Sequence, residues 1–237
     1  MRIIICAVFL NGLILAAPLL RAQDVQILMT GEFAGSYVTA QSGETWYGIY
    51  NDDNQFRLVR TKINVEAIHD DMVIEKEGEK TGKKVSTEQS GNPLFLVRGI
   101  EGLEERVVGA VFQGKKFIFP GEMLRLGEGN SSITVIAFGD IQKPEPRWSP
   151  CYLNYTIQFR EGIHPEYHLL AEYPKLAAFD EIPYLIWAGD LDNDGKLDMF
   201  WDLTGHYAVR QYTLFLSSLA KAGEVVAKAA EFKNIID

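Results

Sequence analysis

Short runs of apolar and β-branched residues alternate with polar ones along most of the chain, and Gly, Asn and Asp separate the runs. A period of two residues with such breaks is typical of consecutive antiparallel strands. The pattern predicts a mainly β fold built from antiparallel, sandwich-like sheets. The predicted strands are 35–40, 45–50, 56–68, 94–97, 107–112, 116–119, 133–138, 153–159 and 168–173.

Three segments between or beyond these strands refine the picture. The sequence Asn-Asp-Asp-Asn at 51–54 joins two predicted strands and indicates a hairpin. Residues 70–92 carry charges of both signs, which favours an exposed loop or a distorted hairpin. The tail 220–232 fits either a helix or a strand, because its Ala, Lys and Glu favour a helix whereas Gly223 and Val225–Val226 interrupt one.

A proline-rich segment at 143–150 is the candidate domain boundary. Its prolines at positions 144, 146 and 150 exclude a helix and a central strand. They predict an N-terminal β region, 23–142, and a C-terminal β region, 151–237. A single continuous sandwich, in which this segment is a long crossover, fits the same pattern.

The N-terminus has the organisation of a secretory signal peptide over residues 1–22. Arg2 precedes an apolar run from Ile3 to Leu15, and small residues with Pro18 lead up to Ala22. The apolar run is shorter than the ~20 residues that a membrane-spanning helix needs. We therefore expect a secreted or periplasmic mature chain with no membrane span.

Composition and charge narrow the function classes. Apolar residues make up 47% and charged residues 23% of the chain, as in ordinary globular proteins. The net charge of -9 repels phosphate backbones, so we expect no nucleic-acid partner. Only Cys151 follows the predicted leader, which excludes an intramolecular disulfide in the mature chain. We expect a monomer.

The loop 190–198, Asp-Leu-Asp-Asn-Asp-Gly-Lys-Leu-Asp, carries the clearest chemical pattern. Calcium is bound by six to eight oxygen atoms, which closely spaced carboxylates on a tight turn supply. The acids occupy positions one, three, five and nine, a backbone carbonyl falls at position seven, and Gly195 at position six permits the sharp turn. The predicted ligands are the carboxylates of Asp190, Asp192, Asp194 and Asp198 and the backbone carbonyl of Lys196.

The flanks of the loop distinguish it from an EF-hand. Position twelve, which is a bidentate Glu in that motif, is Trp201 here. Residues 182–188 and 197–203 have the pattern of strands, and period two places Met199 and Trp201 on the core face and Asp198 on the opposite one, towards the loop. The predicted calcium therefore joins the ends of a β-hairpin, and we expect it to be structural.

The nine-residue pattern Asp-x-Asp-x-Asp-Gly-x-x-Asp between strands resembles the calcium loop of integrin-alpha-type FG-GAP repeats. The longer segment 185–198, continuing to Leu-Phe-Leu-Ser-Ser at 214–218, resembles uncharacterised secreted bacterial proteins with a single such loop. This resemblance covers about the last quarter of the chain and implies calcium as the bound ion. Integrin-type proteins repeat the loop around a propeller and dockerin-like modules use paired copies, whereas this chain has one copy.

The remaining motifs give weaker indications of metal binding or catalysis. His164, Glu166 and His168 would share one face of a strand and supply zinc ligands, although Pro165 disturbs that strand. No nucleophile elbow, His-Glu-x-x-His or phosphate-binding glycine loop occurs. We therefore expect a non-catalytic binding or surface-associated module that recognises a glycan or a cell-surface protein. The alternative is a secreted hydrolase acting on glycans, whose cleft would hold two carboxylates about 5 to 10 Å apart.

Overall fold

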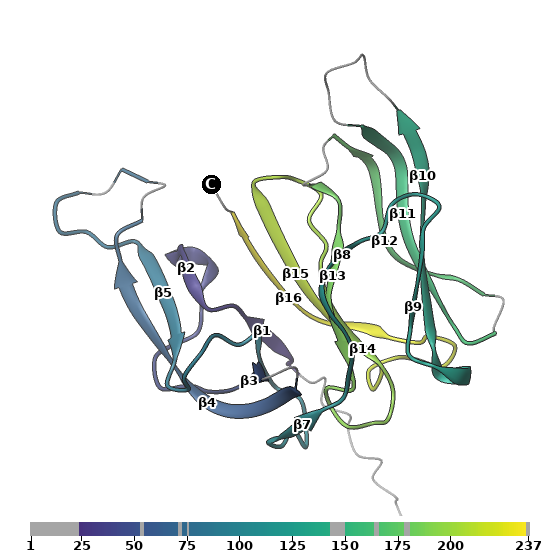
Figure 1. Ribbon diagram of the computed structural model, residues 1–237. Coiled ribbons are helices and arrows are strands. Elements are labelled where there is room, and N and C mark those ends of the chain that lie inside the picture. Colours follow the sequence, from purple (N-terminus) through teal and green to yellow (C-terminus); the bar gives the residue numbers. More distant parts are fainter. Residues whose placement is uncertain are drawn as a thin grey trace, which may run out of the picture.

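The computed structural model describes residues 24–52, 55–70, 73–74, 76–142, 150–163, 166–177 and 181–235. The predicted signal peptide and the segment 143–149 lie outside these ranges. Within them the chain forms antiparallel strands and two short 3-10 turns, with no α-helix (Figure 1). The prediction of a mainly β fold with antiparallel sheets is confirmed.

The first sheet contains seven strands and includes the predicted hairpin. Its register runs from Thr45 opposite Lys62 to Asp52 opposite Gln55, so the hairpin prediction at 51–54 is confirmed. A further strand, β7, pairs with β4 beside the main path of the sheet. In spatial order the strands are β1 (Gln26–Leu28), β6 (Leu96–Arg98), β3 (Thr45–Asp52), β4 (Gln55–Ile68), β5 (Gly82–Thr87) and β2 (Gly31–Ala34), with β7 at Arg106–Val108.

Two further sheets are formed mainly by later parts of the chain. The four-stranded sheet has the order β12 (His168–Leu176), β11 (Cys151–Glu161), β10 (Ile133–Gln142) and β9 (Met123–Leu126). The five-stranded sheet has the order β16 (Ala227–Ile235), β15 (Val209–Leu216), β14 (Asp198–Asp202), β13 (Tyr184–Gly189) and β8 (Ala110–Phe117). In Figure 1 the five-stranded sheet lies between the other two.

Strands from 23–142 and from 151–237 share sheets. β10 pairs with β11 from Ile133 opposite Glu161 to Gln142 opposite Cys151. β8 pairs with β13, with Tyr184 opposite Phe117. The proline-rich segment therefore connects two neighbouring strands of one sheet.

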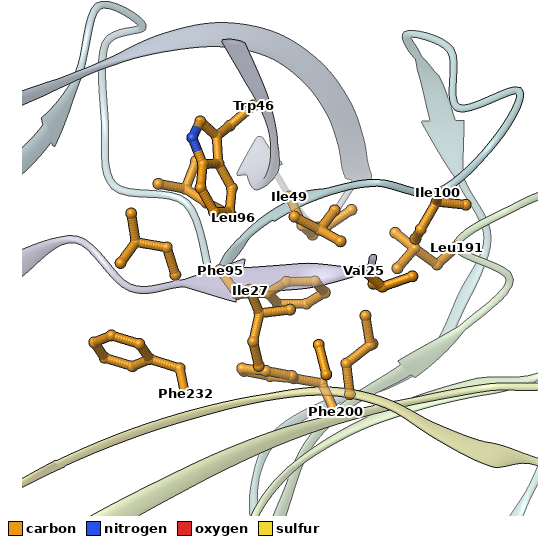
Figure 2. Close-up of a cluster of buried hydrophobic side chains, with 14 of the residues drawn as sticks. Val25, Ile27, Trp46, Ile49, Phe95, Leu96, Ile100, Leu191, Phe200 and Phe232 are labelled. Carbon is orange, nitrogen blue, oxygen red and sulfur yellow. The ribbon is translucent and has the colours of Figure 1, made fainter. Parts of the chain in front are cut away.

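The five-stranded sheet is buried on both faces, and this position comes from the alternation along β14. Phe200 belongs to the hydrophobic cluster shared with the first sheet, where its ring stacks on Phe95 at a centroid distance of 4.2 Å (Figure 2). Met199 and Trp201 belong to a second cluster shared with the four-stranded sheet. The prediction that Met199 and Trp201 face the core is therefore correct, but the opposite face of β14, which carries Phe200, is buried as well.

Several predicted strands differ from the observed ones. The strand at 35–40 is wrong, because residues 35–37 form a 3-10 turn (Gly35–Tyr37). The predicted strand 107–112 is divided between β7 and β8, which break at Gly109, and 116–119 is partly the end of β8. The polar stretch 70–92 contains β5, and residues 227–232 of the ambiguous tail belong to β16, so the strand alternative is correct for that part of the tail. β5 and β16 are stabilised by pairing with β4 and β15, which their local composition does not indicate.

Candidate metal centre

The loop 190–198 joins β13 to β14 in the middle of the five-stranded sheet. Its first residue is fixed by the junction between β7 and β8. The backbone N–H of Asp190 donates to the carbonyl of Gly109 at 3.1 Å, and Nη2 of Arg106 donates to the carbonyl of Asp190 at 2.7 Å. The start of the loop is therefore held by a segment more than eighty residues earlier in the chain.

The carboxylates of Asp190, Asp192 and Asp194 converge, as predicted. Each places one oxygen in a group whose members all lie within 4.8 Å of one another. Oδ1 of Asp190 and Oδ1 of Asp192 are buried and have no hydrogen-bond partner among the described residues. Buried carboxylate oxygens without donors are costly unless a cation balances them.

The turn that brings these carboxylates together uses the glycine that the pattern predicted. Gly195 has a φ of +81°, and its N–H donates to Oδ2 of Asp190 at 3.1 Å. Asn193 also lies in the left-handed region, with a φ of +66°, which Asn tolerates better than most residues. Lys196 donates its backbone N–H to Oδ1 of Asp194 at 2.8 Å, which closes a tight local turn around Gly195.

Two serines that follow β15 complete the surroundings of the loop. Oγ of Ser217 donates to Oδ2 of Asp194 at 2.8 Å, and Oγ of Ser218 donates to Oδ2 of Asp192. The spacing pattern within the loop does not indicate a role for these serines. Their only signal was their place in the segment that resembles secreted single-loop proteins, because the contact spans more than twenty residues of chain.

Asp198, the fifth predicted ligand, has a different environment from the other three acids. Its side chain is fully buried. Oδ2 accepts a hydrogen bond from the N–H of Leu191 at 2.7 Å, and Oδ1 accepts one from the N–H of Ser217 at 2.9 Å. Asp198 is not one of the three converging carboxylates. It connects the start of the loop to the chain after β15.

Burial dominates the electrostatics of the loop. Desolvation raises the pKa of Asp198 to about 7, although the hydrogen bonds from Ser217 and Leu191 oppose this shift. Desolvation also raises the pKa of Asp192, and the nearby charges of Asp194 and Asp190 act in the same direction. Both pKa shifts have the same main cause, because burial disfavours the charged form of a carboxylate.

Leu191, at position two of the loop, anchors it to the hydrophobic core. Its side chain is fully buried and belongs to the cluster between the first and the five-stranded sheets. Figure 2 shows Leu191 beside Ile100 and close to Val25. The loop that carries the acids is thus fixed from beneath by apolar packing.

The other predicted chemistry finds less support. His164 lies outside the described residues, so the zinc triad is not tested, and the ring of His168 stacks on Phe159 at 5.6 Å. A cavity of about 680 Å³ between β12 and the β15–β16 connection contains one carboxylate among its lining residues, Glu224. A second cavity of about 380 Å³ is lined by no described carboxylate.

Three comparisons with known proteins gave no match. No protein-family model, no curated protein and no solved structure matches the chain. In the part of the chain that the structure describes, no helix is long and apolar enough to cross a membrane. Because no relative supplies a function, the chemistry of the loop is argued from the positions of its own residues.

Proposed function

We propose that this chain is a secreted calcium-binding β protein whose calcium is structural, and that it acts as a non-catalytic binding or surface-associated module. The observation that carries the proposal is the convergence of Asp190, Asp192 and Asp194 within 4.8 Å, with two of their buried oxygens lacking a donor. The signal peptide pattern in the sequence supports export.

The ligand set suits calcium. The three converging carboxylates and the carbonyl of Lys196 supply four or more of the six to eight oxygens that calcium takes, and water supplies the rest. Magnesium keeps several waters and is usually held by one or two carboxylates, so three convergent acids favour the larger ion. Asp198 contributes by fixing the loop to Leu191 and Ser217.

A structural role follows from what the loop touches. It contacts the β7–β8 junction through Asp190, the apolar core through Leu191 and the end of β15 through Ser217. An ion at the carboxylates therefore stabilises the place where three distant segments meet. If the dissociation constant is about 0.1 mM, as in extracellular modules, 1 mM calcium adds about 1.4 kcal/mol to the free energy of unfolding.

Calorimetry on chelator-stripped protein tests the proposal. We expect one calcium ion to bind with a dissociation constant of about 0.1 mM, because extracellular calcium modules bind in this range. Asp52→Asn, which removes an exposed carboxylate from the first sheet, serves as the control and should bind calcium like the wild type. Absence of saturable heat up to about 1 mM calcium would overturn the assignment.

A further inference from the structure

The outer face of the four-stranded sheet carries a row of polar side chains that the calcium loop does not use. Thr134 of β10 lies opposite Arg125 of β9 and opposite Arg160 of β11. The three residues are therefore neighbours in a line across three strands. Their chain neighbours Leu126, Ile133 and Phe159 are buried on the other face, so the row faces outward.

This row lines a cavity. A cavity of about 380 Å³ is bounded by both arginines, by Ser132, Thr134 and Gly162, and by the rim residue Ile163. Adjacent strands lie about 5 Å apart, so the two arginine Cα atoms flank that of Thr134 at a total separation of about 10 Å. Arginine side chains are long enough for both guanidinium groups to approach one ligand in this cavity.

Neither arginine lies beside a carboxylate in the part of the chain that the structure describes. Among the described residues, neither guanidinium forms an ion pair with a carboxylate, whereas Arg57, Arg98 and Arg210 each lie beside one. This is notable in a chain with a net charge of -9. Two unpaired cations in one cavity favour an anion.

Arg160 is also held in place. Its guanidinium carbon lies 5.3 Å from the centroid of the Tyr167 ring, a cation–π contact that limits its rotamers. Its Nε is buried and has no hydrogen-bond partner within the described ranges. The hydroxyl of Thr134 likewise has no partner there, so donors on the row remain available to a ligand.

We propose that Arg125, Thr134 and Arg160 form a binding site for a tetrahedral oxoanion, a phosphate or sulfate group. One guanidinium can satisfy both oxygens of a carboxylate. Donors on opposite sides of Thr134, with a hydroxyl between them, instead match a group with three or four oxygens. Tyr167 and the 87% exposed Ile163 provide apolar surface beside the cavity for the part of a ligand that carries the anion, such as a sugar ring.

The site gives the proposed binding module a ligand class without depending on calcium. It lies on the four-stranded sheet, whereas the calcium loop belongs to the five-stranded one (Figure 1). Loss of anion binding and loss of calcium binding can therefore be observed separately in the same protein.

A titration followed by NMR tests this site. The probes are inorganic phosphate, inorganic sulfate, glucose 6-phosphate and glucose 6-sulfate, each added at constant ionic strength against chloride. We expect saturable shifts of the Nε–Hε signals of Arg125 and Arg160 and of the Thr134 amide. Tighter binding of the sugar esters would identify a glycan-borne group, and equal or weaker binding would identify the free ion; both results support the oxoanion site.

Variants make the test specific. Arg125→Gln and Arg160→Gln should each weaken binding about tenfold or more, because each removes charge-assisted hydrogen bonds. Arg57→Gln, on the first sheet, should bind like the wild type. The far-UV circular dichroism spectra and the unfolding temperatures of the variants should match those of the wild type, which shows that they are folded. Shifts that rise linearly without saturation, or that are equal in Arg125→Gln and the wild type, would overturn the proposal.

Discussion

Replacing Asp192 with Asn separates the two effects that the calcium loop predicts, repulsion without the ion and stabilisation with it. Asp192 shares the 4.8 Å group with Asp190 and Asp194. Two unit charges at that distance repel by about 0.9 kcal/mol even at the dielectric constant of water, so removing one charge relieves two such terms, about 1.7 kcal/mol. Asn keeps an oxygen that accepts the hydrogen bond from Ser218. In chelator, Asp192→Asn should therefore be at least as stable as the wild type.

Calcium should remove most of this difference in stability, because only the wild type keeps all three convergent acids. The wild type should gain about 1.4 kcal/mol at 1 mM calcium, which corresponds to a rise in Tm of about 3 to 6 °C for a domain of this size. The variant should gain little, because the site has lost one of its three convergent acids. Thermal unfolding followed by circular dichroism, with and without chelator, measures both gains. Asp52→Asn should respond to calcium like the wild type, and an equal response in Asp192→Asn would refute the ligand assignment.

Two substitutions test how the loop is held. Gly189→Ala should lower the free energy of unfolding by about 1 to 3 kcal/mol, because its Cβ would lie 2.5 Å from the carbonyl oxygen of Gly109 and 2.5 Å from the Trp187 ring. Gly109→Ala is the matched control, because a Cβ at Gly109 meets open space. Equal losses of stability for the two variants in denaturant titrations would contradict the packing argument. Leu191→Ala should cost about 2 to 5 kcal/mol in the same assay, because it leaves a cavity beneath the loop; a cost below about 1 kcal/mol would show that the side chain is not an anchor.

The sequence predicts those parts of the fold in which local pattern and pairing agree. The β3–β4 hairpin combines alternating apolar residues with an Asn- and Asp-rich turn, so its register forms locally. β5 is different, since Gly82–Thr87 contains two lysines and resembles a solvated loop. It is a strand because Ile63 to Ile68 of β4 pair with it, and no local pattern contains that information.

The candidate metal site also has one part that the sequence predicts and one part that it does not. The positions of Asp190, Asp192, Asp194 and Gly195 follow from spacing within one short turn, and the structure brings the three acids together as expected. The environment of Asp198 does not follow from spacing, because its carboxylate accepts a hydrogen bond from the N–H of Ser217, nineteen residues later. The contacts of Asp198 therefore depend on Ser217, which β15 places beside the loop.

The interleaving of early and late strands also constrains the order of folding. β8 pairs with β13, some seventy residues later, and the first hydrophobic cluster is complete only when Phe200 and Phe232 have joined it. Contacts between residues so far apart in the sequence form slowly, because the chain loses the entropy of closing a long loop before the stabilising contacts are made. A chain emerging during synthesis therefore carries an uncovered apolar surface until β16 is available. Until then, this surface makes the incompletely folded chain prone to aggregation.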